Sequence, residues 1–78
     1  MFIVRLKDGI YTTSWIKISQ RADRGTFKMY LKPTSRPRVV IAESENLDLL
    51  ERALKLAWVY VKKNQPVPLD SLLERIGL

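Results

Sequence analysis

The chain has 78 residues, of which 14 are Lys or Arg and 8 are Asp or Glu, so its formal net charge is +6 at pH 7. It contains neither cysteine nor histidine, which excludes disulfides, structural zinc sites, Cys–His or Ser–His–Asp nucleophile systems and imidazole acid–base chemistry. With 46% hydrophobic and 28% charged residues and no apolar run long enough for a signal peptide or membrane span, it is expected to be one small, soluble, cytoplasmic domain.

The first 42 residues have the pattern of β-strands separated by tight turns. Four runs are rich in β-branched and aromatic residues, the third of them alternates strictly with polar residues, and Gly or Pro marks the breaks between the runs. The predicted strands are Phe2–Leu6, Ile10–Gln20 (bent near Ser14), Thr26–Lys32 and Arg38–Ala42. Because every connection is only a few residues long, the strands should form an antiparallel meander.

The remaining residues have helical patterns. Apolar side chains recur at helical spacing from Leu47 to Val61, and Ser44 or Asn46 can cap the start. We expect a long helix over residues 46–64 and a short one over residues 68–76 that ends at Gly77. The predicted fold class is therefore α+β in two layers: a four-stranded antiparallel meander packed on one long helix, followed by a short C-terminal helix.

The positive charge is concentrated in the strand half of the domain. Residues 1–42 contain nine bases and two acids, a net charge of +7, whereas residues 43–78 contain five bases and six acids, a net charge of −1. A charge separated in this way attracts polyanions. Nucleic acid is the expected partner, DNA in preference to RNA, and no cofactor is indicated.

Strand alternation predicts which side chains face away from the helix. In the long strand, Ile10, Thr12, Ile16 and Ile18 are expected on the inner face, and Tyr11, Thr13, Trp15 and Lys17 on the outer face. Cations there would neutralise phosphates, rings would stack on bases, and turn arginines would clamp the backbone or read guanine. The predicted nucleic-acid-binding residues are Arg5, Tyr11, Trp15, Lys17, Arg21, Arg24, Lys28, Tyr30, Lys32, Arg36 and Arg38. The alternative is a solvated face whose charges only prevent strand-to-strand aggregation.

The long helix has a wider apolar arc than one sheet face requires. Trp58, Val59 and Tyr60 are therefore predicted to lie in a dimer or partner interface. This supports a second hypothesis: a non-catalytic protein-interaction module, an inhibitor or adaptor, that docks through this helix surface or a sheet edge. In a monomer, the terminal helix would have to cover the excess apolar surface instead.

Catalysis is not expected. The acids have ordinary roles in helix starts and turns, and the glycines Gly9, Gly25 and Gly77 form no phosphate-binding loop. Neither a catalytic residue nor a metal site is predicted, and the enzymatic alternative is a histidine-free ribonuclease built on Lys, Arg and Tyr. The size and charge are typical of a small regulator of phage or mobile-element type.

The order of elements from Ile10 to Asn64, three strands followed by a packing helix, resembles the AP2-type and integrase arm-binding DNA modules. The resemblance rests on this order, on Gly9 with Tyr11 near a strand start, and on the basic strands. It implies that the sheet reads a DNA groove. The additional first strand and the terminal helix depart from that pattern.

Overall fold

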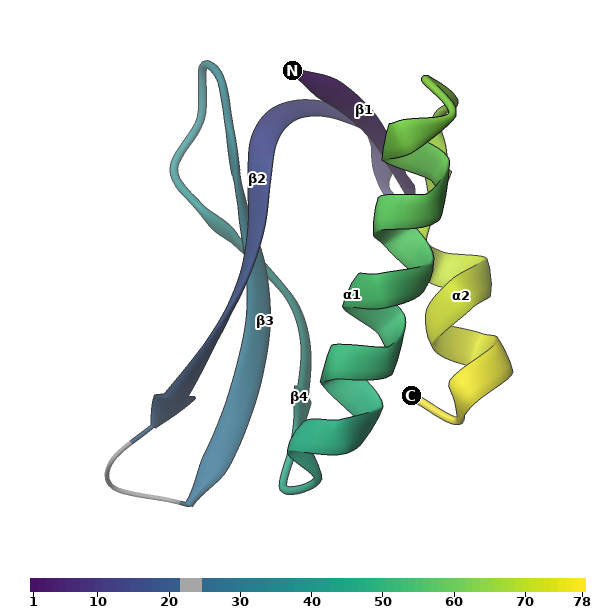
Figure 1. Ribbon diagram of the computed structural model, residues 1–78. Coiled ribbons are helices and arrows are strands. Elements are labelled where there is room, and N and C mark those ends of the chain that lie inside the picture. Colours follow the sequence, from purple (N-terminus) through teal and green to yellow (C-terminus); the bar gives the residue numbers. More distant parts are fainter. Residues whose placement is uncertain (22–24) are drawn as a thin grey trace.

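The computed structural model, which describes residues 1–21 and 25–78, places two helices against one side of a strongly bent sheet (Figure 1). Within these residues the sheet has five strands in the order β4-β3-β2-β1-β5. Both helices follow the first four strands along the chain, and the sheet face away from them is left open. The strands are β1 (Phe2–Leu6), β2 (Gly9–Arg21), β3 (Thr26–Pro33), β4 (Val39–Ser44) and β5 (Val67–Pro68), and the helices are α1 (Leu47–Lys62) and α2 (Leu69–Ile76).

The predicted α+β class and the antiparallel meander are confirmed, with one addition. Strands β1 to β4 pair as antiparallel neighbours. The segment after the long helix, expected only to interrupt it, also forms β5, which runs parallel to β1 with Val67 opposite Val4. A free strand edge presents unpaired backbone groups that attract such a segment, and Pro68 limits the pairing because it lacks an N–H.

The helix boundaries follow from local chemistry. The Asn46 side-chain oxygen accepts a hydrogen bond from the Asp48 N–H at 3.1 Å, which caps α1. The Ser44 hydroxyl accepts from the Asn46 N–H at 3.0 Å, so the second candidate cap holds the preceding turn. Helix α2 ends as predicted at Gly77, whose φ of 90° is the left-handed conformation that glycine adopts most easily.

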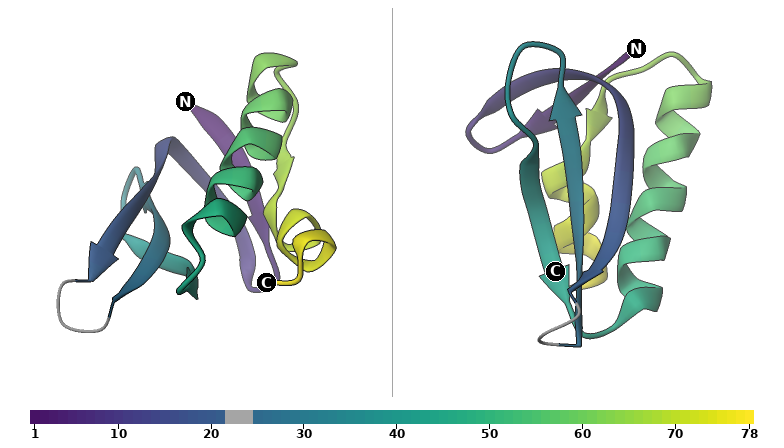
Figure 2. Two further views of the ribbon diagram at one scale, coloured as in Figure 1. Left: turned by 60° about the horizontal axis from the view of Figure 1, so that its bottom comes forward. Right: turned by 90° about the vertical axis from the view of Figure 1, so that its left-hand side faces the viewer.

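Helix α1 forms the centre of the core. Its Leu50, Ala53 and Ala57 are buried, and the two alanines allow close approach of neighbouring elements. Met29 and Leu31 of β3 are fully buried, as are apolar residues of β1, β5 and α2. Helix α2 packs on α1 and on β1, so the two helices lie side by side on the same side of the sheet (Figure 2).

A β-bulge in β2 reverses its side-chain alternation. Strand β2 pairs with β1 up to Thr13. It pairs with β3 at Thr13 and again from Ile16 onward, and the register shifts between these two residues. The bend expected near Ser14 is therefore confirmed, but the faces predicted before it are wrong: Tyr11 is 7% exposed and Ile10 is 69% exposed. An extra residue in one strand moves the following side chains to the opposite face, which simple alternation cannot anticipate.

A second register shift, opposite Met29 and Tyr30, has the same effect in β4. Regular alternation from Val39 would place Ala42 on the outer face, but Ala42 pairs with Met29 and packs against the core. Strand β3 follows simple alternation, since Met29 and Leu31 are buried and Lys28 and Tyr30 are not. Strands β2 and β4 each contain one irregularity, whereas β3 between them alternates regularly.

The side chain of Thr13 holds the bulge in β2. Thr13 is fully buried, and its hydroxyl lies 2.7 Å from the carbonyl oxygen of Lys32 and 3.0 Å from that of Trp15. The same hydroxyl accepts from the Trp15 N–H at 3.3 Å. It thus satisfies backbone groups that the interrupted ladder leaves unpaired.

Replacing Thr13 by valine should lower the free energy of unfolding by about 1–3 kcal/mol, because buried backbone groups lose their partner while the side-chain shape is nearly kept. Urea denaturation followed by tryptophan fluorescence measures this. The matched control is Thr12→Val at the exposed neighbouring position, which should change stability by less than about 0.5 kcal/mol. Equal effects of the two substitutions would contradict the role given to the Thr13 hydroxyl.

Candidate nucleic-acid interface

Four side chains on the open face of the sheet form a cation–aromatic cluster: Trp15, Lys17, Tyr30 and Arg38. The Lys17 ammonium lies 4.7 Å from the centroid of the Trp15 ring, and the Arg38 guanidinium carbon lies 5.1 Å from that of Tyr30. The two rings meet edge to face, with centroids 5.6 Å apart and an interplanar angle of 89°. A continuous row results in which each ring carries one cation.

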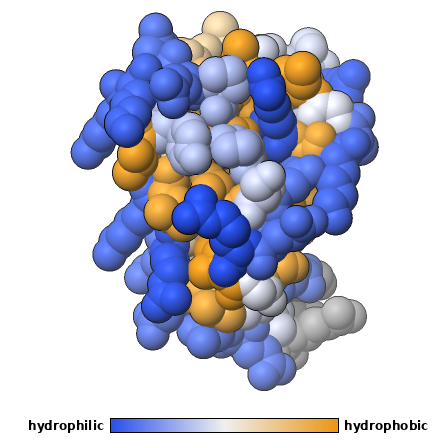
Figure 3. Space-filling view, turned by 90° about the vertical axis from the view of Figure 1, so that its right-hand side faces the viewer, coloured by the Kyte–Doolittle hydropathy of each residue, from blue (hydrophilic) through white to orange (hydrophobic). Residues whose placement is uncertain are grey.

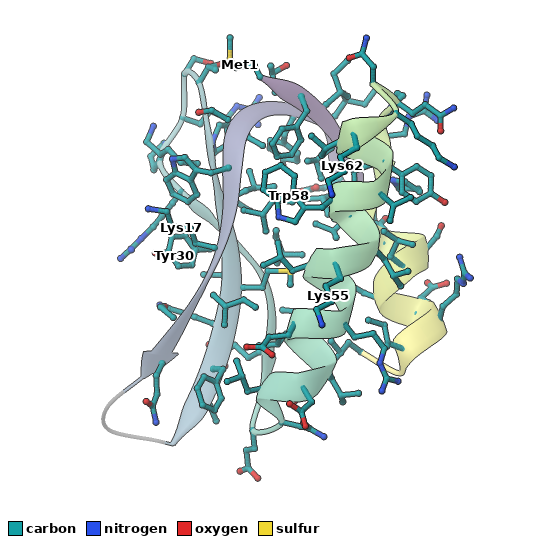
Figure 4. All side chains as sticks on the ribbon, viewed as in Figure 1. Met1, Lys17, Tyr30, Lys55, Trp58 and Lys62 are labelled. Carbon is teal, nitrogen blue, oxygen red and sulfur yellow. The ribbon has the colours of Figure 1, made fainter. Side chains whose placement is uncertain are left out.

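Strand pairing places these four side chains together. Lys17 and Tyr30 are directly opposite in the β2–β3 ladder, and Arg38 immediately precedes β4, whose Val40 pairs with Tyr30. Trp15 faces outward because the bulge lies just before Ile16. Lys17 and Tyr30 project on the side of the sheet away from α1 (Figure 4). Exposed cation–π contacts contribute about 0.5–1 kcal/mol each, enough to restrict the positions of flexible cations.

Lys28 and Lys32 lie on the same face but are held differently. Lys28 pairs with Glu43 across the β3–β4 ladder, so a carboxylate neighbours its charge. The Lys32 ammonium donates to the carbonyl oxygens of Pro33 and Arg36. Lys32 therefore fixes the β3–β4 loop, which carries Arg36 and leads into Arg38.

Tyr11 and Arg36 form a separate group behind the bend. The Tyr11 hydroxyl donates to Asp8 at 2.9 Å, and the Arg36 guanidinium carbon lies 5.5 Å from the centroid of the ring. The hydrogen bond to Asp8, burial and the Asp8 charge together raise the pKa of Tyr11, while Arg36 acts in the opposite direction. Because Tyr11 belongs to the core, its ring is not free to stack on a base.

The structure thus divides the predicted nucleic-acid-binding residues into groups. Trp15, Lys17, Tyr30 and Arg38 form the cluster, with Lys28 and Lys32 beside it. Arg5 is exposed on β1, which pairs with β2 on the far side of the bulge. Arg24 and the side chain of Arg21 lie outside the described residues. The loop-holding role of Lys32 has no signal in the sequence, because the carbonyls it binds are brought to it by the fold.

The predicted interface residues on α1 are also divided. The Trp58 ring packs against that of Phe2, with centroids 5.7 Å apart, yet Trp58 is 39% exposed. Val59 is 47% exposed, whereas Tyr60 is half-buried and packs against the core. Viewed from the helix side, hydrophobic side chains are interspersed with charged ones (Figure 3).

Among the described residues, no three carboxylates lie close enough together to hold a metal ion. In the same part of the chain, neither helix has the length and apolar character needed to cross a membrane.

No family model, curated protein or solved structure matches this chain. The likeness to AP2-type and integrase arm-binding modules thus remains one of element order, and the geometry of the open sheet face is the basis for a functional proposal.

The Tyr11–Asp8 pair predicts a pH dependence. Since the folded-state pKa of Tyr11 is raised above the ordinary value near 10, the protonated hydroxyl stabilises the fold below about pH 10, and this contribution is lost as the pH rises through the folded-state pKa. Asp8→Asn should lower the pH of one tyrosine ionisation step in an ultraviolet titration, and Tyr11→Phe should remove that step. An unchanged titration in Asp8→Asn would contradict the assignment.

Proposed function

We propose that this protein is a small regulatory protein that binds nucleic acid, preferentially duplex DNA, through the open face of β2, β3 and β4. The observation that carries the proposal is the cation–aromatic cluster, in which Lys17 and Arg38 lie over the rings of Trp15 and Tyr30. The net charge of +7 on residues 1–42 supports it, because clustered positive charge steers a protein toward phosphate backbones.

The state of the rings favours duplex over single-stranded nucleic acid. A base can stack only on a free ring face. In this structure a cation lies over the Trp15 ring and another over the Tyr30 ring, and the two rings meet edge to face. Stacking would have to displace Lys17 or Arg38. Phosphate binding requires no such displacement, and a duplex presents about one charge per 1.7 Å of its axis.

Fluorescence anisotropy with labelled duplex DNA, single-stranded DNA and RNA at several salt concentrations tests the proposal. Duplex DNA should bind most tightly, at micromolar or lower Kd, with a log–log salt slope of about −4 to −6, which corresponds to roughly five or six phosphate contacts. If no nucleic acid binds at low salt, the proposal is rejected and the basic face has only the role of keeping the sheet soluble. If single-stranded nucleic acid bound most tightly, the inference that the cluster binds phosphates and does not stack on bases would be contradicted.

A pair of double variants separates this site from general charge. Lys17→Gln with Arg38→Gln removes two cations from the cluster, and Lys55→Gln with Lys62→Gln removes two from exposed positions on α1 (Figure 4). The first pair should weaken binding tenfold or more and make the salt slope shallower by about two. The second should leave the slope nearly unchanged. Equal effects would show that binding follows net charge alone and would overturn the assigned site.

The second candidate function, a protein-interaction module, is favoured by the exposure of Trp58 and Val59 on α1. Large apolar side chains exposed side by side often mark an interface between proteins. If a second copy covers them, sedimentation velocity should show a concentration-dependent dimer that Val59→Glu dissociates, whereas Lys55→Glu should have little effect. If the protein is a monomer at every concentration, the hypothesis of a homodimer through α1 is excluded.

A further inference from the structure

A hollow of about 310 Å³ lies between β4, the turn that joins β1 to β2, and helix α2. Its walls contain aliphatic side chains from all three elements, among them Leu6, Ile41 and Leu73. A volume of this size accommodates one or two large side chains. The hollow is separate from the cation–aromatic cluster, none of whose four members lines it.

The hollow runs along an open edge of the sheet. Strand β4 is the last strand in the order β4-β3-β2-β1-β5, so one of its edges lacks a partner among the described residues. Three consecutive residues, Val39, Val40 and Ile41, line the hollow. Val39 and Val40 keep the regular register opposite Leu31 and Tyr30, so their side chains point to opposite faces, and a hollow lined by both lies beside the strand and not over one face. The unpaired backbone groups of such an edge can accept an added strand.

The rim of the hollow is acidic, in contrast to the rest of this basic protein. Asp8, Asp70 and Glu74 lie there with a single base, Lys7, which gives a local net charge of −2. Lys7 pairs with Glu74 at 3.3 Å, but both side chains are mostly exposed, so the pair is weak and easily rearranged. The rim therefore attracts a cationic ligand.

We propose that this edge binds an extended peptide segment that carries aliphatic and basic side chains at every second residue, on the one face that points toward α2. The peptide adds a strand to β4 through main-chain hydrogen bonds. An aliphatic side chain enters the hollow against Ile41 and Leu73, and basic side chains meet Asp70 and Glu74 at the rim. The occupant is a segment of another protein with that chemistry.

Charge disfavours a second copy of this chain as the occupant. Two β4 edges pairing with each other would bring two acidic rims toward one another. A basic extended segment has the opposite and complementary charge.

The probe is a short fluorescein-labelled peptide with valine and arginine in turn at every second position and threonine between them, titrated by anisotropy. It should bind more tightly than the same peptide with glutamate in place of arginine. A version with alternate backbone amides N-methylated should lose binding, because it cannot form the strand pairing. Hydrogen exchange of the complex should show new protection of backbone amides in residues 39–44. Equal binding of the N-methylated or glutamate peptide, or protection elsewhere, would overturn the proposal.

The variant Asp70→Asn with Glu74→Gln should weaken peptide binding about three- to tenfold, since charge pairs near the protein surface are individually weak. The matched control is Glu45→Gln with Glu51→Gln, which removes two exposed carboxylates outside the hollow and should leave the affinity unchanged. Lys17→Gln with Arg38→Gln should also bind the peptide normally, so failure here is distinguishable from failure of nucleic-acid binding. Equal weakening by the control, or a β4-mediated dimer that excludes the peptide, would contradict the assigned occupant.

Discussion

The bulge that Thr13 stabilises in β2 is the constraint on which the arrangement of this domain depends. A 13-residue strand with regular alternation would direct Tyr11 outward with Trp15. By inserting one residue, the bulge moves Tyr11 and Thr13 to the core side and leaves Trp15 on the open face. The same irregularity bends the sheet. On one side of the bend β1 pairs with β5 and packs on α2, and on the other side the second half of β2 pairs with β3. One buried hydroxyl, satisfied by two neighbouring strands, thus decides both the shape of the sheet and the composition of its faces.

The open face shows how a small domain can hold many like charges close together. Each of the two cations in the cluster lies over an aromatic ring, and Lys32 donates to loop carbonyls. Rings and carbonyl oxygens both present negative partial charge, so they orient a cation without neutralising it as a carboxylate would. The conformational entropy of these side chains is therefore lost during folding. Less of it remains to be lost on binding, which is the advantage of a preorganised site.

The domain also separates its surfaces by charge. The cations of β2 and β3 lie on the open sheet face, while Asp8, Asp70 and Glu74 gather beside the edge of β4. Complementary partners of opposite sign could therefore occupy the two surfaces together, since none of the cluster residues lines the hollow. The exposed edge of β4 is in addition a point at which strand pairing can extend the sheet. The two proposed recognition surfaces thus share a single core in a chain of 78 residues.

The sequence by itself determined strands β1 to β4, the two helices and their order, because strand patterns, helix periodicity, a cap at Ser44 or Asn46 and Gly77 as a stop are local signals. It also determined that Lys17, Lys28 and Tyr30 share a face, since β3 is regular and Lys17 follows the bulge. The tertiary structure alone decided that Tyr11 is core, that Ala42 faces inward and that residues after Pro66 join β1. Each of these depends on a register shift or a free edge in a neighbouring strand, and register is a property of two strands that neither sequence segment contains on its own.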